Sequence, residues 1–402
     1  MRIKKLVSII AMGVLMIAAP MLLSANVGAA SGVAINDKNF PDKQFQKYIK
    51  ENYDKNKDGS LSASEINDVK EISPGYVEIS DFTGLKFFSK LEVFISYYDG
   101  VSEIDVSHNP ELKDLRVTSR LLDSIDVSCN PKLTKFTVNY MRISDITVLP
   151  GLDLKAQADY QTIKSVRSTN EDIFEAKDDT DRDFFGRECH IVCLKTKKAG
   201  NAKIVIKDIY GGEGEVNVRV IYKDVKNRSD FWYEPTYYLS DKDVVKGYDK
   251  QTLFKPANDC TRAQMVTFLW RLAGSPSPKA KKTDFKDVNS SDYFFKAVIW
   301  AVEQGITTGV SKDKFDPQGV CTRAQTVTFL WRMAGKPEPA SKKCKFSDVK
   351  SKDYFYIATI WASEKKIVAG YSDGTFQPKG KCLRRQMVTF LYKYDKNVNG
   401  KG

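Results

Sequence analysis

The sequence predicts a multidomain α+β protein with a small helical cap, a repetitive solenoid, a small β-rich module and a mainly helical C-terminal region. Two repeat periods and one alternating pattern of apolar and polar residues predict this fold class. A 21-residue unit recurs after residue 104, a 61-residue unit occurs three times after residue 222, and residues 201–222 alternate apolar and polar side chains. A chain of 402 residues is long enough for two to four domains.

Residues 1–30 have the pattern of an export signal. "MRIKK" carries three positive charges, "LVSIIAMGVLMIAAPMLL" is apolar and "NVGAA" ends in small residues, so we expect cleavage after Ala30. No cysteine stands directly after the apolar run, which disfavours a lipoprotein anchor. No later stretch has the roughly 18 consecutive apolar residues of a transmembrane helix. The sequence therefore predicts a secreted protein with no membrane span after signal cleavage.

Residues 31–72 contain the pattern of a calcium loop. "DKNKDGSLSASE" places oxygen-bearing side chains at alternate positions, glycine at the sixth and glutamate at the twelfth. Calcium binds six to eight hard oxygens, and this spacing resembles the EF-hand loop. The alternative is a solvated acidic turn. A single loop favours a structural Ca²⁺ over a sensor. The expected ligands are Asp54, Asn56, Asp58, Ser60 through its carbonyl, Ser62 through a water, and Glu65.

Residues 73–152 repeat with a period of 21. "IDVSHNPELKDLRVTSRLLDS" at Ile104 recurs as "IDVSCNPKLTKFTVNYMRISD" at Ile125. These units resemble short bacterial leucine-rich repeats, in which inward apolar residues stack from coil to coil. The amides of Asn109 and Asn130 are expected to satisfy backbone groups of the loops rather than bind a ligand. We expect the calcium unit to cover the open N-terminal end of this solenoid.

The sequence of residues 153–221 predicts a separate β-rich module. "NAKIVIKD" and "GEVNVRVIY" alternate apolar and polar residues and are separated by a Gly-Gly turn signal. This part resembles a bacterial immunoglobulin-like domain, which implies a small β-sandwich-like fold.

The remaining chain repeats a helix–loop–helix pattern over residues 222–276, 282–337 and 343–395. "CTRAQMVTFLWR", "CTRAQTVTFLWR" and "CLRRQMVTFLYK" lie 61 residues apart, and each follows an F-x-P sequence. We expect Thr322 to cap the second helix of its unit in a capping box with Gln325, and Thr261 to do the same in the first unit. The third unit has Leu383 at that position, so its helix lacks a side-chain cap.

The pattern D-V, W-A, G, F-x-P and T-R-A-[EQ] resembles the S-layer homology domain in three tandem copies. The resemblance implies a pseudo-threefold trimer of repeats within one chain. Its grooves would bind secondary cell-wall polysaccharide of Gram-positive bacteria, often capped by a pyruvylated sugar. Residues 223–402 carry a net charge of +14 and residues 31–222 carry −5, so the basic part suits an anionic polymer. Export argues against nucleic acid as the anionic partner. The alternative explanation of the positive charge is that lysines keep the loops soluble.

The resemblance also assigns polysaccharide-binding residues. A guanidinium group can bind a carboxylate through two hydrogen bonds, and an indole ring can stack on a sugar. The alternatives are arginines that lie along the helix with their heads in water and tryptophans that belong to the core. The family's motif glutamate is replaced here by Gln264, Gln325 and Gln386, which removes a charge. The assigned residues are Arg262, Arg323, Arg384, Gly309, Gly370, Asp373, Trp300 and Trp361.

Catalytic motifs are not evident. The two histidines, His108 and His190, fall in different modules, and no nucleophile motif, phosphate-binding loop or zinc helix occurs. The cysteines that precede the repeated helices are expected to be small buried apolar residues. We therefore expect a noncatalytic protein that the Gram-positive cell wall holds at its surface and that displays the calcium-stabilised repeats. The alternatives are an adhesin whose repeats bind a host or neighbouring protein, and a cell-wall glycan hydrolase.

Overall fold

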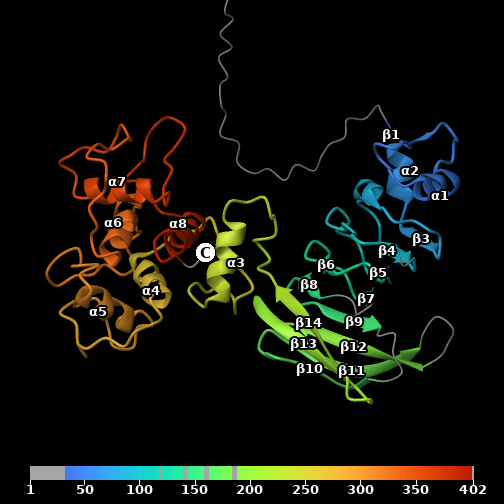
Figure 1. Ribbon diagram of the computed structural model, residues 1–402, viewed down its shortest axis with the longest axis horizontal. Coiled ribbons are helices and arrows are strands. Elements are labelled where there is room, and N and C mark those ends of the chain that lie inside the picture. Colours follow the sequence, from blue (N-terminus) through green and yellow to red (C-terminus); the bar gives the residue numbers. More distant parts are fainter. Residues whose placement is uncertain are drawn as a thin grey trace, which may run out of the picture.

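The computed structural model describes residues 32–98, 100–117, 119–138, 144–157, 163–182 and 188–400. The expected signal segment, residues 1–30, lies outside the described residues. A helical cap and a solenoid form one end, a group of long strands forms the middle, and a cluster of helices forms the other end (Figure 1). Over the described ranges, no helix combines the length and the apolar character that crossing a membrane requires.

The N-terminal cap pairs β1 (Val33–Ala34) with β2 (Ser60–Leu61) and contains α1 (Lys43–Tyr53) and α2 (Ala63–Asp68). Asp42 caps α1 by accepting hydrogen bonds from the backbone N–H groups of Gln44 and Phe45. The rings of Phe45 and Phe82 meet edge to face at 5.1 Å, and Phe82 meets Phe94 at 4.9 Å. Because these rings are buried, the core of the cap continues into the solenoid.

A parallel β-solenoid follows the cap. Val93 pairs with Asp114 and Asp114 pairs with Lys135, so successive coils are in register with the 21-residue period of the sequence. A second sheet begins in the later coils, where Ser124 pairs with Asp145. The elements are β3 (Glu71–Gly75), the 3-10 helix η1 (Thr83–Phe87), β4 (Val93–Ser96), β5 (Asp114–Val117), β6 (Ser124–Asp126), β7 (Lys135–Val138), β8 (Asp145–Val148) and β9 (Asp153–Gln157).

Two buried asparagines link the coils. The side-chain nitrogen of Asn109 donates hydrogen bonds to the carbonyls of Leu85 (3.0 Å) and Phe88 (2.9 Å). Asn130, one period later, donates to the carbonyls of Val106 and Asn109, both at 2.9 Å. Buried carbonyls need such partners, so the expected role of these amides in satisfying backbone groups is confirmed.

The β-rich region is joined to the solenoid, which differs from the separate module that the sequence predicted for residues 153–221. One sheet has the order β11-β12-β9-β7-β5-β4-β3 and the other β10-β13-β14-β8-β6. Strand β14 pairs with the solenoid strand β8, which removes an exposed sheet edge. The strands of this region are β10 (Ile163–Ser168), β11 (Phe174–Arg182), β12 (Glu188–Thr196), β13 (Gly200–Asp208) and β14 (Glu213–Val220).

The chain passes from β14 into the first helical repeat without a linker. The backbone N–H of Ile221 donates to the carbonyl of Val148 (2.9 Å), and that of Tyr222 donates to the hydroxyl of Tyr237 (2.9 Å). Arg219 and Asp241 add an ion pair at 3.0 Å. These contacts tie the helical region directly to the sheets.

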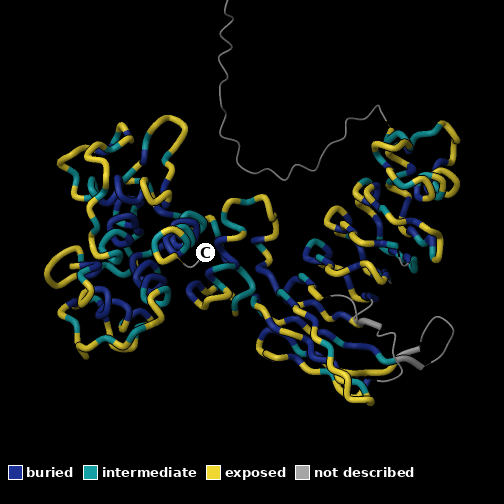
Figure 2. Tube along the Cα trace, viewed as in Figure 1, coloured by how far each residue is buried: buried dark blue, intermediate teal, exposed yellow. Residues whose placement is uncertain are grey.

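The helical repeats close into a ring. The second helix of each repeat packs against the first helix of the next, so α4 meets α5, α6 meets α7, and α8 returns to α3 (Figure 1). The expected pseudo-threefold arrangement is therefore present, and buried residues fill its interior (Figure 2). The helices are α3 (Tyr233–Asp241), α4 (Arg262–Leu272), α5 (Phe295–Glu303), α6 (Arg323–Met333), α7 (Tyr356–Glu364) and α8 (Arg384–Asn397).

Three cysteines mark the centre of the ring. The N–H of Cys260 donates to the carbonyl of Cys382, that of Cys321 to Cys260, and that of Cys382 to Cys321, each at 2.9 Å. All three thiols are free and buried, and burial raises their pKa values. They are small apolar residues of the core, as the repeated position predicted.

Candidate functional site

Each helix that follows the repeated cysteine begins with a buried arginine. Arg262, Arg323 and Arg384 are 4, 5 and 2% exposed. Their Nε atoms donate to the carbonyl oxygens of the phenylalanines in the F-x-P sequences of the following repeats. The acceptors are Phe315 for Arg262 (2.9 Å), Phe376 for Arg323 (2.8 Å) and Phe254 for Arg384 (2.9 Å). We call these contacts the Arg262, Arg323 and Arg384 junctions.

A carboxylate positions each F-x-P loop. The two oxygens of Asp287 accept hydrogen bonds from the N–H groups of Phe315 (2.9 Å) and Asp316 (2.7 Å). Asp316 has a φ of +61°, a left-handed conformation in which the backbone turns sharply. Asp224 and Asp348 repeat this arrangement in the other two units. Sequence reasoning missed this role, although the threefold recurrence of K/S-D-V was its signal.

Aromatic rings surround the arginine heads. The guanidinium carbon of Arg384 lies 4.7 Å from the ring centre of Tyr248 and 4.4 Å from that of Phe254. Arg323 has the same environment, at 4.9 Å from Tyr371 and 4.8 Å from Phe376. Such contacts stabilise a cation away from bulk water.

The Arg262 junction has a different aromatic environment. The guanidinium carbon of Arg262 lies 4.9 Å from the ring centre of Phe315 and 5.6 Å from that of Phe329. Val310 takes the sequence position that tyrosine has in the other units. Burial lowers the pKa values of Arg262 and Arg323, but an arginine in a protein keeps its charge at neutral pH.

The loop glycines that the resemblance assigned serve the backbone. Gly309 and Gly370 have φ values of +80° and +79°. A Cβ atom on Gly309 would lie 2.6 Å from the carbonyl oxygen of Lys314, and one on Gly370 would lie 2.8 Å from that of Thr375. Only glycine fits so close to another backbone segment in this conformation.

Asp373 lies in an exposed turn of the third repeat. Its Oδ1 accepts hydrogen bonds from the N–H (2.9 Å) and the hydroxyl (2.6 Å) of Thr375. These bonds hold its pKa below the ordinary value. The carboxylate therefore shapes the turn that follows Gly370.

The two assigned tryptophans lie in the core, which corrects their assignment as sugar-stacking residues. Trp300 is 6% exposed and Trp361 is 1% exposed, so neither ring presents a face to a ligand. The alternative that they are packing residues describes this structure. Among the described residues of the repeats, the aromatics that are more than half exposed are instead Phe231, Tyr293 and Tyr354, at 58, 61 and 64%. Sequence reasoning missed them, although each follows an aspartate in the equivalent D-[YF]-[FW] sequence.

The motif glutamines complete helix caps. Gln325 accepts from the N–H of Thr322 (2.9 Å) and its own N–H donates to the Thr322 hydroxyl (3.2 Å), which confirms the capping box. Thr261 and Gln264 form the same pair. Leu383, the N-cap residue of α8, has no side-chain acceptor, and only the bond from its N–H to Gln386 (3.1 Å) remains. The amide of Gln264 also donates to the Tyr248 hydroxyl at 2.7 Å.

The calcium-loop residues form a tight turn. Asp54 accepts hydrogen bonds from the N–H groups of Asp58 (3.2 Å) and Gly59 (3.0 Å), and Gly59 has a φ of +82°. Asn56 and Asp58 bind each other through a side-chain contact of 2.9 Å. Ser60 pairs with Ala34 across the short β1–β2 ladder.

Glu65 closes the same loop from α2. It accepts from the N–H of Ser62 (2.8 Å), the hydroxyl of Ser62 (2.7 Å) and the N–H of Lys55 (2.8 Å). The bonds from Ser62 and then Lys55 outweigh burial and lower its pKa. The side chains of this loop carry oxygen atoms, which are the ligands that calcium prefers. In the part of the chain described, however, no three Asp, Glu, His or Cys side chains gather closely enough to hold a metal ion.

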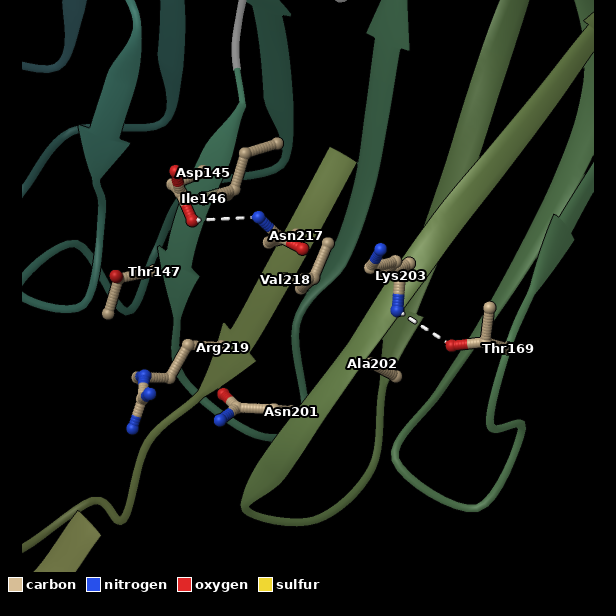
Figure 3. A pocket seen from close by; sticks show the side chains of 10 residues that line it. All are labelled: Asp145, Ile146, Thr147, Thr169, Asn201, Ala202, Lys203, Asn217, Val218 and Arg219. Carbon is tan, nitrogen blue, oxygen red and sulfur yellow. Dashed lines mark hydrogen bonds between the residues drawn. The ribbon is translucent and has the colours of Figure 1, made fainter. Parts of the chain in front are cut away.

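Two polar depressions lie beside the five-stranded sheet. One, of about 880 Å³, is lined by solenoid residues including Asp105, His108 and Asp126 and by Arg228 of the first repeat. The other, of about 520 Å³, shares Asp145 and Thr147 with it (Figure 3). Figure 3 shows its lining residues on β8, β13 and β14 and at Thr169, with both polar and apolar side chains, and Asn217 donates to Asp145 at 3.2 Å.

Comparison with known proteins identifies the helical repeats. Residues 221–266, 284–327 and 345–388 each match the S-layer homology domain. The chain carries three tandem S-layer homology domains. These domains include the three junction arginines and the F-x-P loops that receive them.

Several curated proteins share this region. The chain is 31% identical over 155 residues to a cellulosome-anchoring protein of Acetivibrio thermocellus, covering 37% of this chain and 34% of that protein. It is 34% identical over 134 residues to an S-layer protein of Bacillus thuringiensis subsp. finitimus, covering 32% and 16%. It is 33% identical over 128 residues to an endoglucanase of a Bacillus species, covering 31% and 13%. The chain spans about a third or less of the length of these relatives.

Solved structures give a weaker likeness. An internalin from Listeria monocytogenes has 11% identity and a TM-score of 0.19, covering 31% of this chain and 54% of that one. The functional domain of InlJ from the same species has 15% identity and a TM-score of 0.19, covering 30% and 39%. TM-scores of this size do not establish a shared fold.

The S-layer homology domains and the S-layer relatives indicate association with the cell surface. The same domains occur in relatives named as enzymes, such as the endoglucanase. Possession of the domains therefore does not decide between a catalytic and a noncatalytic protein.

Proposed function

We propose that this chain is a secreted, noncatalytic surface protein that its S-layer homology ring anchors to an anionic secondary polysaccharide of a Gram-positive cell wall. The supporting observation is that three matched domains close into one ring with an arginine held under a neighbouring loop at each junction. The relative named as a cellulosome-anchoring protein supports an anchoring role for this region.

The charge of the ring suits an anionic polymer. Residues 223–402 carry a net charge of +14, whereas the exported part before them carries −5. A basic surface attracts a polyanion over a distance of about 8–10 Å at physiological salt. The arginines at the junctions add positive charge in poorly solvated positions, where an anion is bound more strongly than in bulk water.

The solenoid is then the displayed part of the protein. Hydrogen bonds from Ile221 to Val148 and from Tyr222 to Tyr237 join it to the ring without a flexible connection. A structural Ca²⁺ at the loop of Asp54 and Glu65 would stiffen the cap at the far end. Oxygen donors of the right type and the turn at Gly59 support this part of the proposal.

Sedimentation with cell walls tests the anchoring. The chain without residues 1–30 is mixed with purified Gram-positive walls, before and after acid extraction of the secondary polymer. We expect sedimentation with the untreated walls only. Equal sedimentation with both preparations, or with neither, contradicts the proposal. Release of soluble sugars from the same walls during the assay would contradict the noncatalytic part.

The polar depressions beside the five-stranded sheet favour a second candidate function, which is binding of a neighbouring or host protein. Thr147 lines both depressions, so Thr147→Arg would partly fill each of them. If this surface binds protein, the substitution should abolish adhesion of chain-coated beads to cells that lack the wall polymer, while sedimentation with purified walls persists. Adhesion that survives it removes this candidate.

A further inference from the structure

The seven-stranded sheet presents one of its faces to the outside. Phe94, Leu115 and Phe136 point into the core and are fully buried, so the residues on either side of them in β4, β5 and β7 point outward. The strands lie side by side in the order β3, β4, β5, β7 and β9 (Figure 1). The outward residues therefore form continuous rows across the strands, and we call this surface the outer face of the seven-stranded sheet.

Apolar side chains gather at the end of this face that lies next to the cap. Tyr76, which follows β3, is 75% exposed, and Val77 beside it is 38% exposed. The ring of Tyr76 lies 5.4 Å from that of Tyr97, which follows β4. Val93 and Ile95, at alternate positions before Tyr97, are half-buried. A group of exposed aromatic and aliphatic side chains on a protein surface marks a site of contact with a partner.

An ion pair fixes the middle of the face. Nε and Nη2 of Arg116 donate to the two oxygens of Asp114 at 2.9 and 2.7 Å. The bond to Asp114 raises the pKa of Arg116, burial opposes this rise, and a hydrogen bond with Tyr97 adds to it. Tyr97 is therefore held between Arg116 and the ring of Tyr76 before any partner arrives. A tyrosine and an arginine that are already fixed in place lose little conformational entropy on binding, and both residue types are common where protein contacts are strongest.

Two lysines lie farther along the same face. Lys135 of β7 is paired directly with Lys155 of β9 in the sheet register, and both side chains are exposed. Among the described residues, neither ammonium group has an ion-pair partner. Like charges that face each other across neighbouring strands destabilise a sheet. A carboxylate bound between the two ammonium groups would remove this repulsion, so this end of the face favours an anion.

The two ends of the face together describe one kind of partner. The aliphatic groups of Val77, Val93 and Ile95 offer no hydrogen bonds to the hydroxyls of a sugar, whereas they suit an apolar side chain of a polypeptide. Only β5 separates β4 from β7, so the apolar group and Lys135 lie about 10 Å apart at about 4.8 Å per strand. An extended peptide covers that distance in about three residues.

We propose that the outer face of the seven-stranded sheet binds an acidic polypeptide segment. An aromatic or aliphatic side chain of the segment packs against Tyr76 and Tyr97, and a carboxylate about three residues away lies between Lys135 and Lys155. This surface belongs to a different sheet from the polar depressions. Its use does not require the helical ring to bind the wall.

Protection of individual lysines from acetylation tests the proposal. The chain without residues 1–30 is mixed with a random copolymer of glutamate and tyrosine, or with polyglutamate, and mass spectrometry follows the acetylation of each lysine. The copolymer should slow acetylation of Lys135 and Lys155 about tenfold at about ten times its Kd. Polyglutamate should need an about tenfold higher concentration for the same protection. Because each lysine is scored by itself, binding of either polymer to the basic ring does not disturb this readout.

Substitution of the exposed tyrosine tests the apolar end. Tyr76→Ala should raise the copolymer concentration for half-maximal protection of Lys135 and Lys155 about tenfold and leave that for polyglutamate unchanged. Tyr210→Ala is the matched control, because Tyr210 is 83% exposed on the turn between β13 and β14 of the other sheet. Thr147→Arg, beside the polar depressions, is a second control, and neither control should change the protection.

Each other outcome contradicts part of the proposal. No protection of Lys135 and Lys155 by the copolymer overturns it. Equal protection by the copolymer and by polyglutamate, or an unchanged midpoint in Tyr76→Ala, removes the apolar contact and with it the polypeptide partner. Protection by polygalacturonate that equals protection by the copolymer would assign the face to an acidic glycan instead. None of these results involves cell walls, so failure here is distinguishable from failure of the proposed anchoring.

Discussion

Nε of Arg384 donates a hydrogen bond of 2.9 Å to the carbonyl oxygen of Phe254, although 130 residues separate the two in the chain. Arg384 lies in the last repeat and Phe254 in the first, so this bond closes the ring. The same bond joins the first repeat to the second and the second to the third. A motif repeated three times therefore makes three contacts between repeats.

Loss of the closing arginine should destabilise the ring. Arg384→Ala removes the bonds to Phe254 and Lys246 and leaves a cavity beside two rings. We expect the free energy of unfolding of the helical region to fall by about 2–4 kcal/mol in urea titrations. Lys381→Ala is the matched control, because it breaks an exposed bridge between the same repeats, to Asp259, and should cost at most about 1 kcal/mol. Equal effects would show that Arg384 has no special role in closure.

Asp395 predicts a pH dependence of the same closure. It is buried between α3 and α8, where it accepts from the Lys242 ammonium (2.7 Å) and the Tyr238 hydroxyl (2.8 Å). Burial alone raises its pKa, but the bonds from Lys242, Asn399 and Tyr238 outweigh burial and hold the pKa below the ordinary value of 3.8. A carboxyl group with a lowered folded pKa stabilises above its unfolded pKa, and that stabilisation is lost as the pH falls through the folded value.

The test compares unfolding of the unsubstituted chain and Asp395→Asn across pH. The unsubstituted chain should be more stable by a constant amount between about pH 5 and pH 7, and the difference should shrink below about pH 4. Urea titrations at each pH measure it. A difference that stays constant to pH 2 would contradict the lowered pKa.

The sequence predicted those features that depend on local or repeating patterns. The 21-residue period set the register of Val93 with Asp114, because each coil of a parallel solenoid repeats the same strand. The Thr322 and Gln325 capping box was predictable because all of its atoms belong to two residues that are three positions apart in the chain. The ring followed from the resemblance of the repeats, which also carried its pseudo-threefold arrangement.

The features that the sequence did not predict depend on contacts between distant segments. The pairing of β14 with β8 joins residues about 70 apart, so the β-rich region could not be placed on the solenoid from its own alternation. Trp361 and Tyr354 are both aromatic and lie seven residues apart, and only ring closure decides that the first is buried and the second exposed. The repeated arginine likewise did not show from sequence that its Nε atom would donate to a phenylalanine carbonyl of the next repeat.

The asparagine ladder should contribute strongly to the solenoid. Asn130→Ala removes two buried hydrogen bonds between coils, to the carbonyls of Val106 and Asn109, and each carbonyl keeps only its backbone N–H donor. We expect a loss of about 2–3 kcal/mol in the free energy of unfolding, measured by the solenoid transition in urea. Asn227→Ala, on an exposed loop, is the control and should change stability by less than about 0.5 kcal/mol. A similar small effect at both positions would contradict the structural role of the ladder.

Calcium should raise the melting temperature of the cap through Glu65, if the loop binds it as proposed. The gain from 1–5 mM Ca²⁺, in the range that weak extracellular sites require, should fall sharply in Glu65→Gln. The amide can still accept from the N–H of Ser62, so the start of α2 should survive in the absence of calcium.

Asp68→Asn is the control. It removes a carboxylate outside the loop, where Asp68 pairs with Lys55, and this variant should keep the full gain in melting temperature. An unchanged gain in Glu65→Gln would place any bound calcium elsewhere. No gain in the unsubstituted chain would mean that backbone hydrogen bonds to Asp54 and Glu65 hold the loop without a metal.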